Sequence, residues 1–155
     1  MTENQFVNDM YLSPHFTFFE LTKTNTEFKQ PNIDYGLSNC NKLVKLAAFA
    51  EEVRAVLGVP MAVTSAVRCP ELNRAVGGAE NSQHLKCEAV DFICIGMSNV
   101  RAFDLIRESA LDFDQLILEQ AGGKEWLHIS TGTRNEVLKY DGKKYIRIEH
   151  YDNKN

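Results

Sequence analysis

The sequence predicts an α+β fold in which helices pack on a mainly antiparallel sheet. One long amphipathic segment ending at Leu57 lies in the first half of the chain. Segments rich in β-branched and aromatic residues dominate the second half. Between two of them lies the dipeptide Asp141-Gly142, which is typical of the tight turn that joins antiparallel strands. Helices that precede a run of strands indicate this fold class.

The first 37 residues carry few periodic signals. Thr17 and Glu20 have the spacing of a capping box, in which each side chain binds the backbone N–H of the other residue. We therefore expect a short helix after Thr17. Pro31 is expected to interrupt regular structure beyond this helix.

The clearest predicted helix runs from Ser38 or Asn39 to Leu57, and Gly58 ends it. Apolar residues recur along it at helical spacing and form one stripe that faces the core. The members of the stripe are Leu43, Leu46, Ala47, Ala50, Val53 and Leu57.

Two shorter helices are expected later in the chain. The segment 70–76 has Pro70 at its start and is followed by Gly77. Ser98 can cap a helix that runs to about Ser109. Its predicted buried residues are Val100, Phe103 and Ile106.

The remaining regular segments are expected to be strands, because they are short and rich in residues that favour sheets. Alternation in the segment 126–130 places Leu127 and Ile129 on one face and Trp126, His128 and Ser130 on the other. The predicted strands are 59–64, 89–95, 113–119, 126–130, 136–140 and 144–149.

Two segments hold the residues with the clearest chemistry. The first contains His84 and Asp91, and the second, Glu125-Trp126-Leu127-His128, lies about forty residues later. Two imidazoles and one carboxylate are the protein ligands of a catalytic zinc site that leaves one position for water. Since the chain has only four histidines, two in one constellation are informative. His15 and His150 are expected to be ordinary surface or core residues.

Geometry limits how these ligands can meet. On one helix His84 and Asp91 would lie about 10.5 Å apart along the axis, which excludes shared coordination. We expect His84 to project from a loop and Asp91 from the strand after it. Strict alternation would turn Glu125 away from His128, so Glu125 is expected before the strand proper or on a bulged edge.

At these residues the chain resembles the zinc D-Ala-D-Ala carboxypeptidase and L-alanyl-D-glutamate endopeptidase family, the M15-like peptidases. The family pattern is Ser-x-His-x-x-Gly-x-Ala-x-Asp followed by an acidic residue-x-x-His element. The matching positions are Ser82, His84, Ala89, Asp91, Glu125 and His128. The resemblance covers residues 15–130, and the segment 15–22 is similar to the start of small phage-type members.

The resemblance implies a fold similar to DD-peptidases and Hedgehog proteins, with Zn²⁺ held by His84, Asp91 and His128. It implies Glu125 as the catalytic base. Glu119 and Asp114, which flank a strand rich in Leu and Ile, are rival candidates. The segment 64–73 resembles the family's arginine stretch, which implies that Arg68 binds substrate or polarises its carbonyl. Ser82 and Trp126 are the other expected substrate-binding residues, Trp126 as a wall of the site.

Cys87 departs from the family pattern, because it stands where the family has glycine. If that position requires a positive φ, Cys87 carries a strain of roughly 1–2 kcal/mol. A cysteine three residues from His84 is also a possible zinc ligand. We expect the thiol to fill a glycine site, because a second ligand three residues from His84 would need a tight turn aimed at the same metal.

Composition bounds the class of protein. A chain of 155 residues fits one domain, expected over residues 1–155 with its core at about 15–150. The net charge of −4 without a basic run argues against nucleic acid, and no apolar stretch is long enough to span a membrane. The start of the chain lacks signal-peptide features, and the four cysteines do not form a disulfide framework. We expect a monomer made in the cytoplasm.

The resulting hypothesis is a zinc peptidase that cuts D-amino-acid-containing bonds of peptidoglycan stem peptides. We expect a phage or prophage endolysin that reaches the cell wall after release through a holin. One alternative is a cytoplasmic D,D-dipeptidase or muropeptide carboxypeptidase. A second alternative is a non-enzymatic binding module of the same fold.

Overall fold

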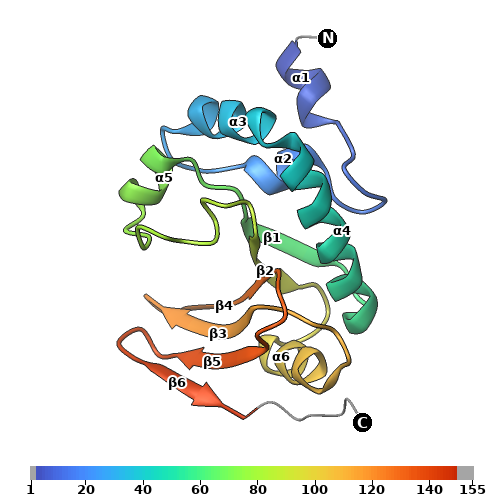
Figure 1. The fold of residues 1–155 in the computed structure, drawn as a ribbon, viewed down its shortest axis with the longest axis vertical. Helices are drawn as coiled ribbons and strands as arrows, with labels where there is room; N and C mark the ends of the chain where they lie inside the picture. Colours follow the sequence, from blue (N-terminus) through green and yellow to red (C-terminus); the bar gives the residue numbers. More distant parts are fainter. Residues whose placement is uncertain (1–2, 150–155) are drawn as a thin grey trace. The chain divides into compact units, whose positions relative to one another are not determined.

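The computed structural model describes residues 3–149 and has an α+β fold (Figure 1). Its sheet has six strands in the order β1-β2-β4-β3-β5-β6. Strand β3 pairs antiparallel with β4 and parallel with β5, and β5 pairs antiparallel with β6. The predicted class, helices with a mainly antiparallel sheet, is confirmed. Among the described residues, no helix has the length and apolar character needed to cross a membrane.

The helices are α1 (Glu3–Asn8), α2 (Phe18–Thr22), α3 (Lys29–Ser38), α4 (Cys40–Leu57), α5 (Pro70–Ala75) and α6 (Asn99–Glu108). The strands are β1 (Met61–Ser65), β2 (Ala89–Cys94), β3 (Gln115–Ala121), β4 (Lys124–Ser130), β5 (Glu136–Tyr140) and β6 (Tyr145–Ile148).

The chain divides into two compact units. The first comprises Met1–Glu51 and Val63–Val90, and the second comprises Glu52–Ala62 and Asp91–Asn155. Each unit has its own buried apolar residues, among them Phe18 and Leu43 in the first and Phe103 and Leu127 in the second. The assignment of the whole chain to one domain stays a prediction.

Helix α2 begins with the predicted capping box. Thr17 Oγ1 accepts a hydrogen bond from the Glu20 backbone N–H at 3.2 Å, and Glu20 Oε2 accepts one from the Thr17 backbone N–H at 2.8 Å. Both bonds satisfy N–H groups that have no partner within the helix. The short helix expected after Thr17 is therefore confirmed.

Helix α3 is the main element that the sequence did not predict. The expectation that Pro31 interrupts regular structure is wrong, because Pro31 is the third residue of this helix. Backbone N–H groups in the first turn of a helix have no intrahelical partner, so proline, which has no backbone N–H, is tolerated there.

Gly36 allows α3 to approach α2 closely. A Cβ atom at this position would lie 2.6 Å from Thr22 Cγ2 and 3.0 Å from Phe18 Cζ. Both of these neighbours are buried. Glycine is therefore required at this helical position by packing and not by backbone conformation.

The long helix α4 matches its prediction closely. All six residues of the expected apolar stripe are buried. Gly58 follows the helix with φ of 69°, the left-handed conformation typical of a residue that ends a helix.

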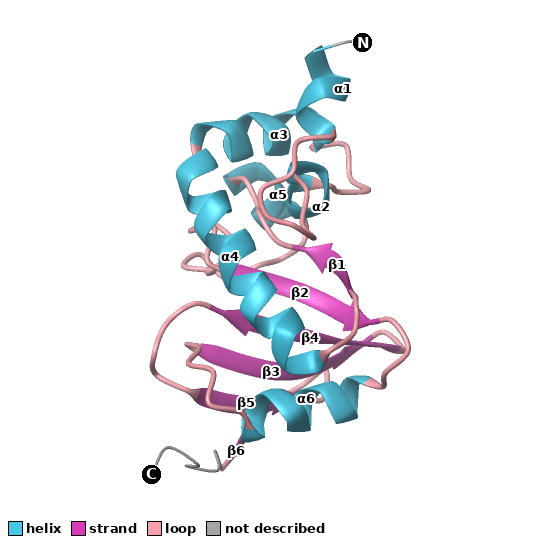
Figure 2. Ribbon diagram, turned by 90° about the vertical axis from the view of Figure 1, so that its right-hand side faces the viewer, coloured by secondary structure: helices cyan, strands magenta, loops and turns pink. Residues whose placement is uncertain are grey.

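In the second unit, α6 packs against β3 and β4 (Figure 2). Phe103 and Ile106 are buried as predicted. The prediction for Val100 is wrong, since its side chain is 49% exposed. At 3.6 residues per turn Val100 lies about 160° around the helix from Ala102 and about 120° from Ile106, so it falls outside the stripe that these buried residues form.

One face of the sheet in this unit is directed toward α6. Lys139 Nζ lies 5.7 Å from the centroid of the Phe103 ring, and Lys139 pairs with Leu118 across β5 and β3. Because neighbours along a strand alternate between faces, Glu119 and Tyr140 lie on the opposite face. The predicted strand 113–119 begins two residues later than expected, at Gln115.

The packing at Gly36 gives a first testable prediction. Gly36→Ala gains helix propensity of about 1 kcal/mol but overpacks a closed site at a cost of roughly 1–3 kcal/mol. We expect a lower midpoint of urea unfolding with an unchanged slope. Leu37→Ala, at an exposed position of the same helix, is the control and should change the midpoint little. A Gly36→Ala protein more stable than wild type would contradict the close packing of α2 and α3.

Candidate metal centre

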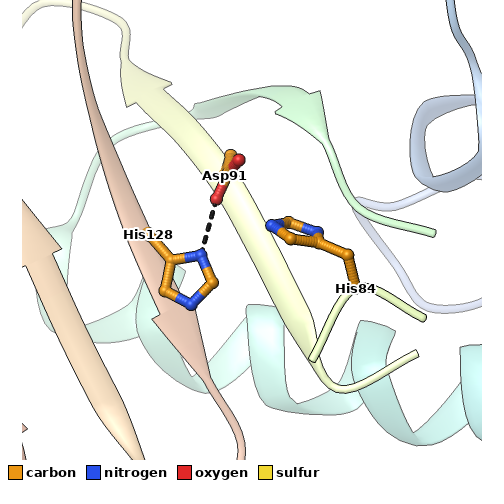
Figure 3. Close-up of side chains that lie close together, drawn as sticks. All are labelled: His84, Asp91 and His128. Atoms are coloured by element: carbon orange, nitrogen blue, oxygen red, sulfur yellow. Dashed lines mark hydrogen bonds and ion pairs between the residues drawn. The ribbon is translucent and has the colours of Figure 1, made fainter. Parts of the chain in front are cut away.

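Three ionisable side chains lie together in the structure. His84, Asp91 and His128 each offer one ligand atom, and these atoms all lie within 4.8 Å of one another. All three are buried, with exposed fractions of 3%, 6% and 8%. Figure 3 shows the three side chains pointing toward one another. Burying ionisable groups is costly unless they are paired or bind a metal, so the arrangement favours a bound ion.

His84 lies in the turn segment that precedes β2, as predicted. Its Nδ1 atom is 2.6 Å from the carbonyl oxygen of Ala66. A carbonyl can only accept, so Nδ1 carries the proton and donates it. With Nδ1 engaged by this carbonyl, Nε2 is the ring nitrogen that would bind a metal, which is the usual arrangement for a metal-binding histidine. A contact with a backbone carbonyl leaves no signal in the sequence, so Ala66 was not among the predicted site residues.

Asp91 lies on β2 and His128 on β4. His128 Nδ1 and Asp91 Oδ1 are 2.8 Å apart and share a hydrogen bond. The strands fix both residues, so the two side chains meet without depending on a mobile loop. A carboxylate and an imidazole at this separation can also bind one ion together.

The donor set fits zinc. Two imidazole nitrogens and one carboxylate oxygen are common zinc ligands, and three protein ligands leave a fourth position for water. Tetrahedral ligands of zinc lie about 3.5 Å apart, a separation that falls within the 4.8 Å bound on these ligand atoms. No other group of three or more His, Cys, Asp or Glu within residues 3–149 has this proximity.

Arg68 is positioned beside the His84 segment. Its backbone N–H donates to the His84 carbonyl at 3.2 Å, and its Nε donates to Ser65 Oγ at 3.2 Å. Ser82 Oγ accepts from the His84 backbone N–H at 3.3 Å, so this hydroxyl helps to shape the turn that carries the ligand. The substrate-binding roles of Arg68 and Ser82 stay predictions.

The structure corrects the expected position of Glu125. It lies inside β4, in regular register opposite Gln120, and not before the strand or on a bulge. Its Oε2 accepts from Gln120 Nε2 at 2.7 Å. Alternation places Glu125 on the face of Leu127, opposite to that of His128. The two-residue turn at Gly122-Gly123 explains the difference, because it allows pairing to continue to the strand ends.

Glu119 shares the face of His128. It pairs directly with Trp126, two residues from His128 along β4. Diagonal neighbours of this kind are separated by roughly 7–8 Å, which is within reach of long side chains. The carboxylate of Asp114, the other rival base, is held by Arg134 through Nε at 3.1 Å and Nη2 at 2.9 Å.

Trp126 is half-buried on the same face. Its indole Nε1 atom is buried and has no hydrogen-bond partner among the described residues. Along β4, Trp126 lies between His128 and the turn that joins β3 to β4. This placement is consistent with the predicted wall of the site, and that role stays a prediction.

Cys87 has φ of 57°, the left-handed conformation that the family's glycine suggested. Its side chain packs with Phe18, Leu43 and Val67 in the core of the first unit. Burial raises the pKa of the Cys87 thiol to about 11, so the thiol is neutral near pH 7. A neutral thiol in an apolar cluster is a poor metal ligand, which favours the packing role.

The donor set and its burial are those of a hydrolytic metal centre with an open position. A family model described as Peptidase M15 matches residues 14–130. The chain therefore belongs to the peptidase M15 family, a family of metallopeptidases. No curated protein matches the chain.

Zinc stoichiometry tests the ligand set. Wild-type protein loaded with zinc and then desalted should keep about one ion per chain, and His84→Ala and His128→Ala should lose it. Elemental analysis measures the content, and His15→Ala is the matched control at an exposed histidine. Full zinc content in both ligand variants would show that the assignment is wrong.

Cys87 gives a separate prediction. Cys87→Gly removes the side chain at a positive φ and should keep zinc content and turnover within about twofold, since the thiol is not a ligand. Cobalt-substituted wild-type protein should show no strong thiolate-to-metal charge-transfer band. Such a band, absent from Cys87→Gly, would place the sulfur on the metal.

Proposed function

We propose that this protein is a zinc-dependent peptidase that cleaves D-amino-acid-containing bonds in peptidoglycan stem peptides. The buried group of His84, Asp91 and His128, on a chain of the peptidase M15 family, is the observation that carries the proposal. The α+β architecture supports a fold similar to that of DD-peptidases and Hedgehog proteins.

His84, through Nε2, together with Asp91 and His128 would hold the zinc ion. When bound, zinc lowers the pKa of a coordinated water toward 7 and polarises the substrate carbonyl. The Ala66 carbonyl keeps the proton of His84 on Nδ1 and thereby fixes the ring orientation. Burial of the three ligands excludes bulk water and strengthens their electrostatic interactions.

A carboxylate on the His128 face is best placed to accept the proton of the attacking water. The sequence assigns this role to Glu125, and that assignment stays a prediction. The strand register supports Glu119 instead, because Glu119 and His128 share one face and Glu125 lies on the other. The Glu119 carboxylate would take the proton and return it to the leaving amine.

Arg68 would bind the carboxylate of the substrate or stabilise the developing oxyanion. Its fork of N–H donors suits both tasks, and its backbone is bonded to the His84 segment. Ser82 would keep the turn in place and contact substrate, and Trp126 would line the site. No step requires nucleic acid or a lipid surface.

The setting that we propose is a phage or prophage endolysin, which acts on the wall after release through a holin. The similarity of the segment 15–22 to small phage-type members supports it. A D,D-dipeptidase would act on free dipeptides instead of intact wall. A binding module would keep the metal and hydrolyse neither.

Mass spectrometry of digested peptidoglycan separates these possibilities. Zinc-loaded protein is incubated with purified sacculi and, separately, with free D-Ala-D-Ala. Release of stem-peptide fragments from sacculi, abolished by a chelator and restored by zinc, is the expected result. Cleavage of the dipeptide alone would indicate the dipeptidase, and cleavage of neither substrate would contradict a peptidase.

The choice of base makes a paired prediction. Glu119→Gln should keep zinc and lower kcat at least about 10²-fold, because the proton acceptor is lost. Glu125→Gln should stay near wild type, since Glu125 faces away from His128 and bonds Gln120. Steady-state kinetics on one stem peptide measures both variants. The reverse pattern would return the role to Glu125.

A further inference from the structure

Helix α3 carries two side chains that reach the loops of the candidate metal centre. Asn32 and Tyr35 are three residues apart, so they lie on neighbouring positions of one helix face. Asn32 contacts the segment 67–69, and Tyr35 contacts the segment that contains His84. The predicted functional residues of this unit therefore depend on a helix that has no predicted role.

Asn32 brackets Arg68. Its side chain is completely buried. Its Nδ2 donates to the Val67 carbonyl at 3.0 Å, and its Oδ1 accepts from the Cys69 backbone N–H at 2.8 Å. The carboxamide thus binds the residue before Arg68 and the residue after it. A third bond, from Nδ2 to the Thr22 carbonyl at 2.6 Å, ties the same side chain to the end of α2.

Both N–H donors of the carboxamide and its oxygen are engaged, so its orientation is fixed. The backbone groups that it binds lie in a region with no strand pairing of their own. Loss of the amide would leave them buried without these partners, which backbone groups rarely tolerate.

Tyr35 provides the matching contact on the second loop. Its hydroxyl donates to the carbonyl of Leu85, the residue after His84. The two loops are also joined directly, by the Arg68 N–H to the His84 carbonyl and by His84 Nδ1 to the Ala66 carbonyl. One helix face and two cross-loop bonds therefore fix the backbone of Arg68 relative to that of His84.

We propose that Asn32 is a positioning residue, which holds the Val67–Cys69 backbone so that the Arg68 side chain is directed at the substrate. Asn32 touches neither substrate nor metal and acts through Arg68. The inference rests on the proposed function, because it takes Arg68 to act on the substrate. Small displacements of such a group can lower turnover by about 10²-fold, so positioning has a kinetic signature.

A double-mutant cycle tests this assignment with the full-length, zinc-loaded protein. Asn32→Ala should lower kcat/KM for a stem peptide by at least about tenfold while zinc content stays at one per chain. In an Arg68→Ala background the same change should cost less than about twofold, because residues that act through one another are not additive. An equal loss in both backgrounds would overturn the proposal and reduce Asn32 to a support of the fold.

Asn39→Ala is the matched control. Asn39 also donates from Nδ2 to a backbone carbonyl, that of Tyr35 at 2.8 Å, at the end of the same helix. It does not contact the 67–69 segment. The kinetics of Asn39→Ala should remain near wild type. This control separates the general effect of losing a side-chain hydrogen bond in α3 from the positioning of Arg68.

Hydrogen exchange gives a readout that does not need activity. The Cys69 amide should exchange at least about tenfold faster in Asn32→Ala than in wild type or Asn39→Ala. The Asn73 amide, which donates to the Cys69 carbonyl at 2.9 Å within α5, is the internal reference and should not change. Unchanged exchange at Cys69 would overturn the proposal, whereas a wild type that hydrolyses no stem peptide would overturn the proposed function alone.

Asn32→Asp covers the case in which the alanine variant does not fold. Its oxygen can still accept from Cys69, but only a protonated carboxyl can donate to the Val67 carbonyl. The loss of kcat/KM relative to wild type should therefore grow as pH rises, and it should vanish in the Arg68→Ala background. A loss that is independent of pH and of Arg68 would contradict positioning.

Discussion

The hydrogen bond between His84 Nδ1 and the Ala66 carbonyl is the constraint on which the candidate metal centre depends. It selects the tautomer in which Nε2 can bind a metal, and it sets the plane of the ring. The same pair of segments is joined again by the Arg68 N–H and the His84 carbonyl. A predicted metal ligand and a predicted substrate-binding residue are thus held in one short hydrogen-bonded structure. The packing of α3 against it, through Asn32 and Tyr35, is the support of that structure.

A second constraint is the period of two along β4. Leu127 and Ile129 are fully buried on the side of α6, while His128 lies between them on the other side. A shift of one residue in register would exchange these faces, so the packing of the core also determines the direction of His128. The same register brings Glu119 to the His128 face and removes Glu125 from it. Hydrophobic burial therefore decides which of the two acids shares the face of His128.

The sequence predicted best those elements whose signal is periodic and local. The stripe of α4, the hairpin at Asp141-Gly142 and the capping box at Thr17 each depend on residues close in sequence, and each is confirmed. The group of His84, Asp91 and His128 was predicted from scarce residue types in a family pattern. Helix α3 could not be predicted in this way. Its buried residues include Asn32 and Gly36, which are buried by contacts with distant segments and form no periodic apolar pattern. The predicted position of Glu125 was wrong for a related reason, because the register of a strand depends on its partner strand.

Zinc K-edge X-ray absorption of the zinc-loaded protein tests the central claim most directly, because it reports the ligands without relying on activity. We expect a first shell of nitrogen and oxygen at about 2.0–2.1 Å, with outer-shell scattering from two imidazole rings and no sulfur. The predicted spectrum should be unchanged in Cys87→Gly. A sulfur shell at about 2.3 Å, or a spectrum with no imidazole contribution, would contradict a metal centre built from His84, Asp91 and His128.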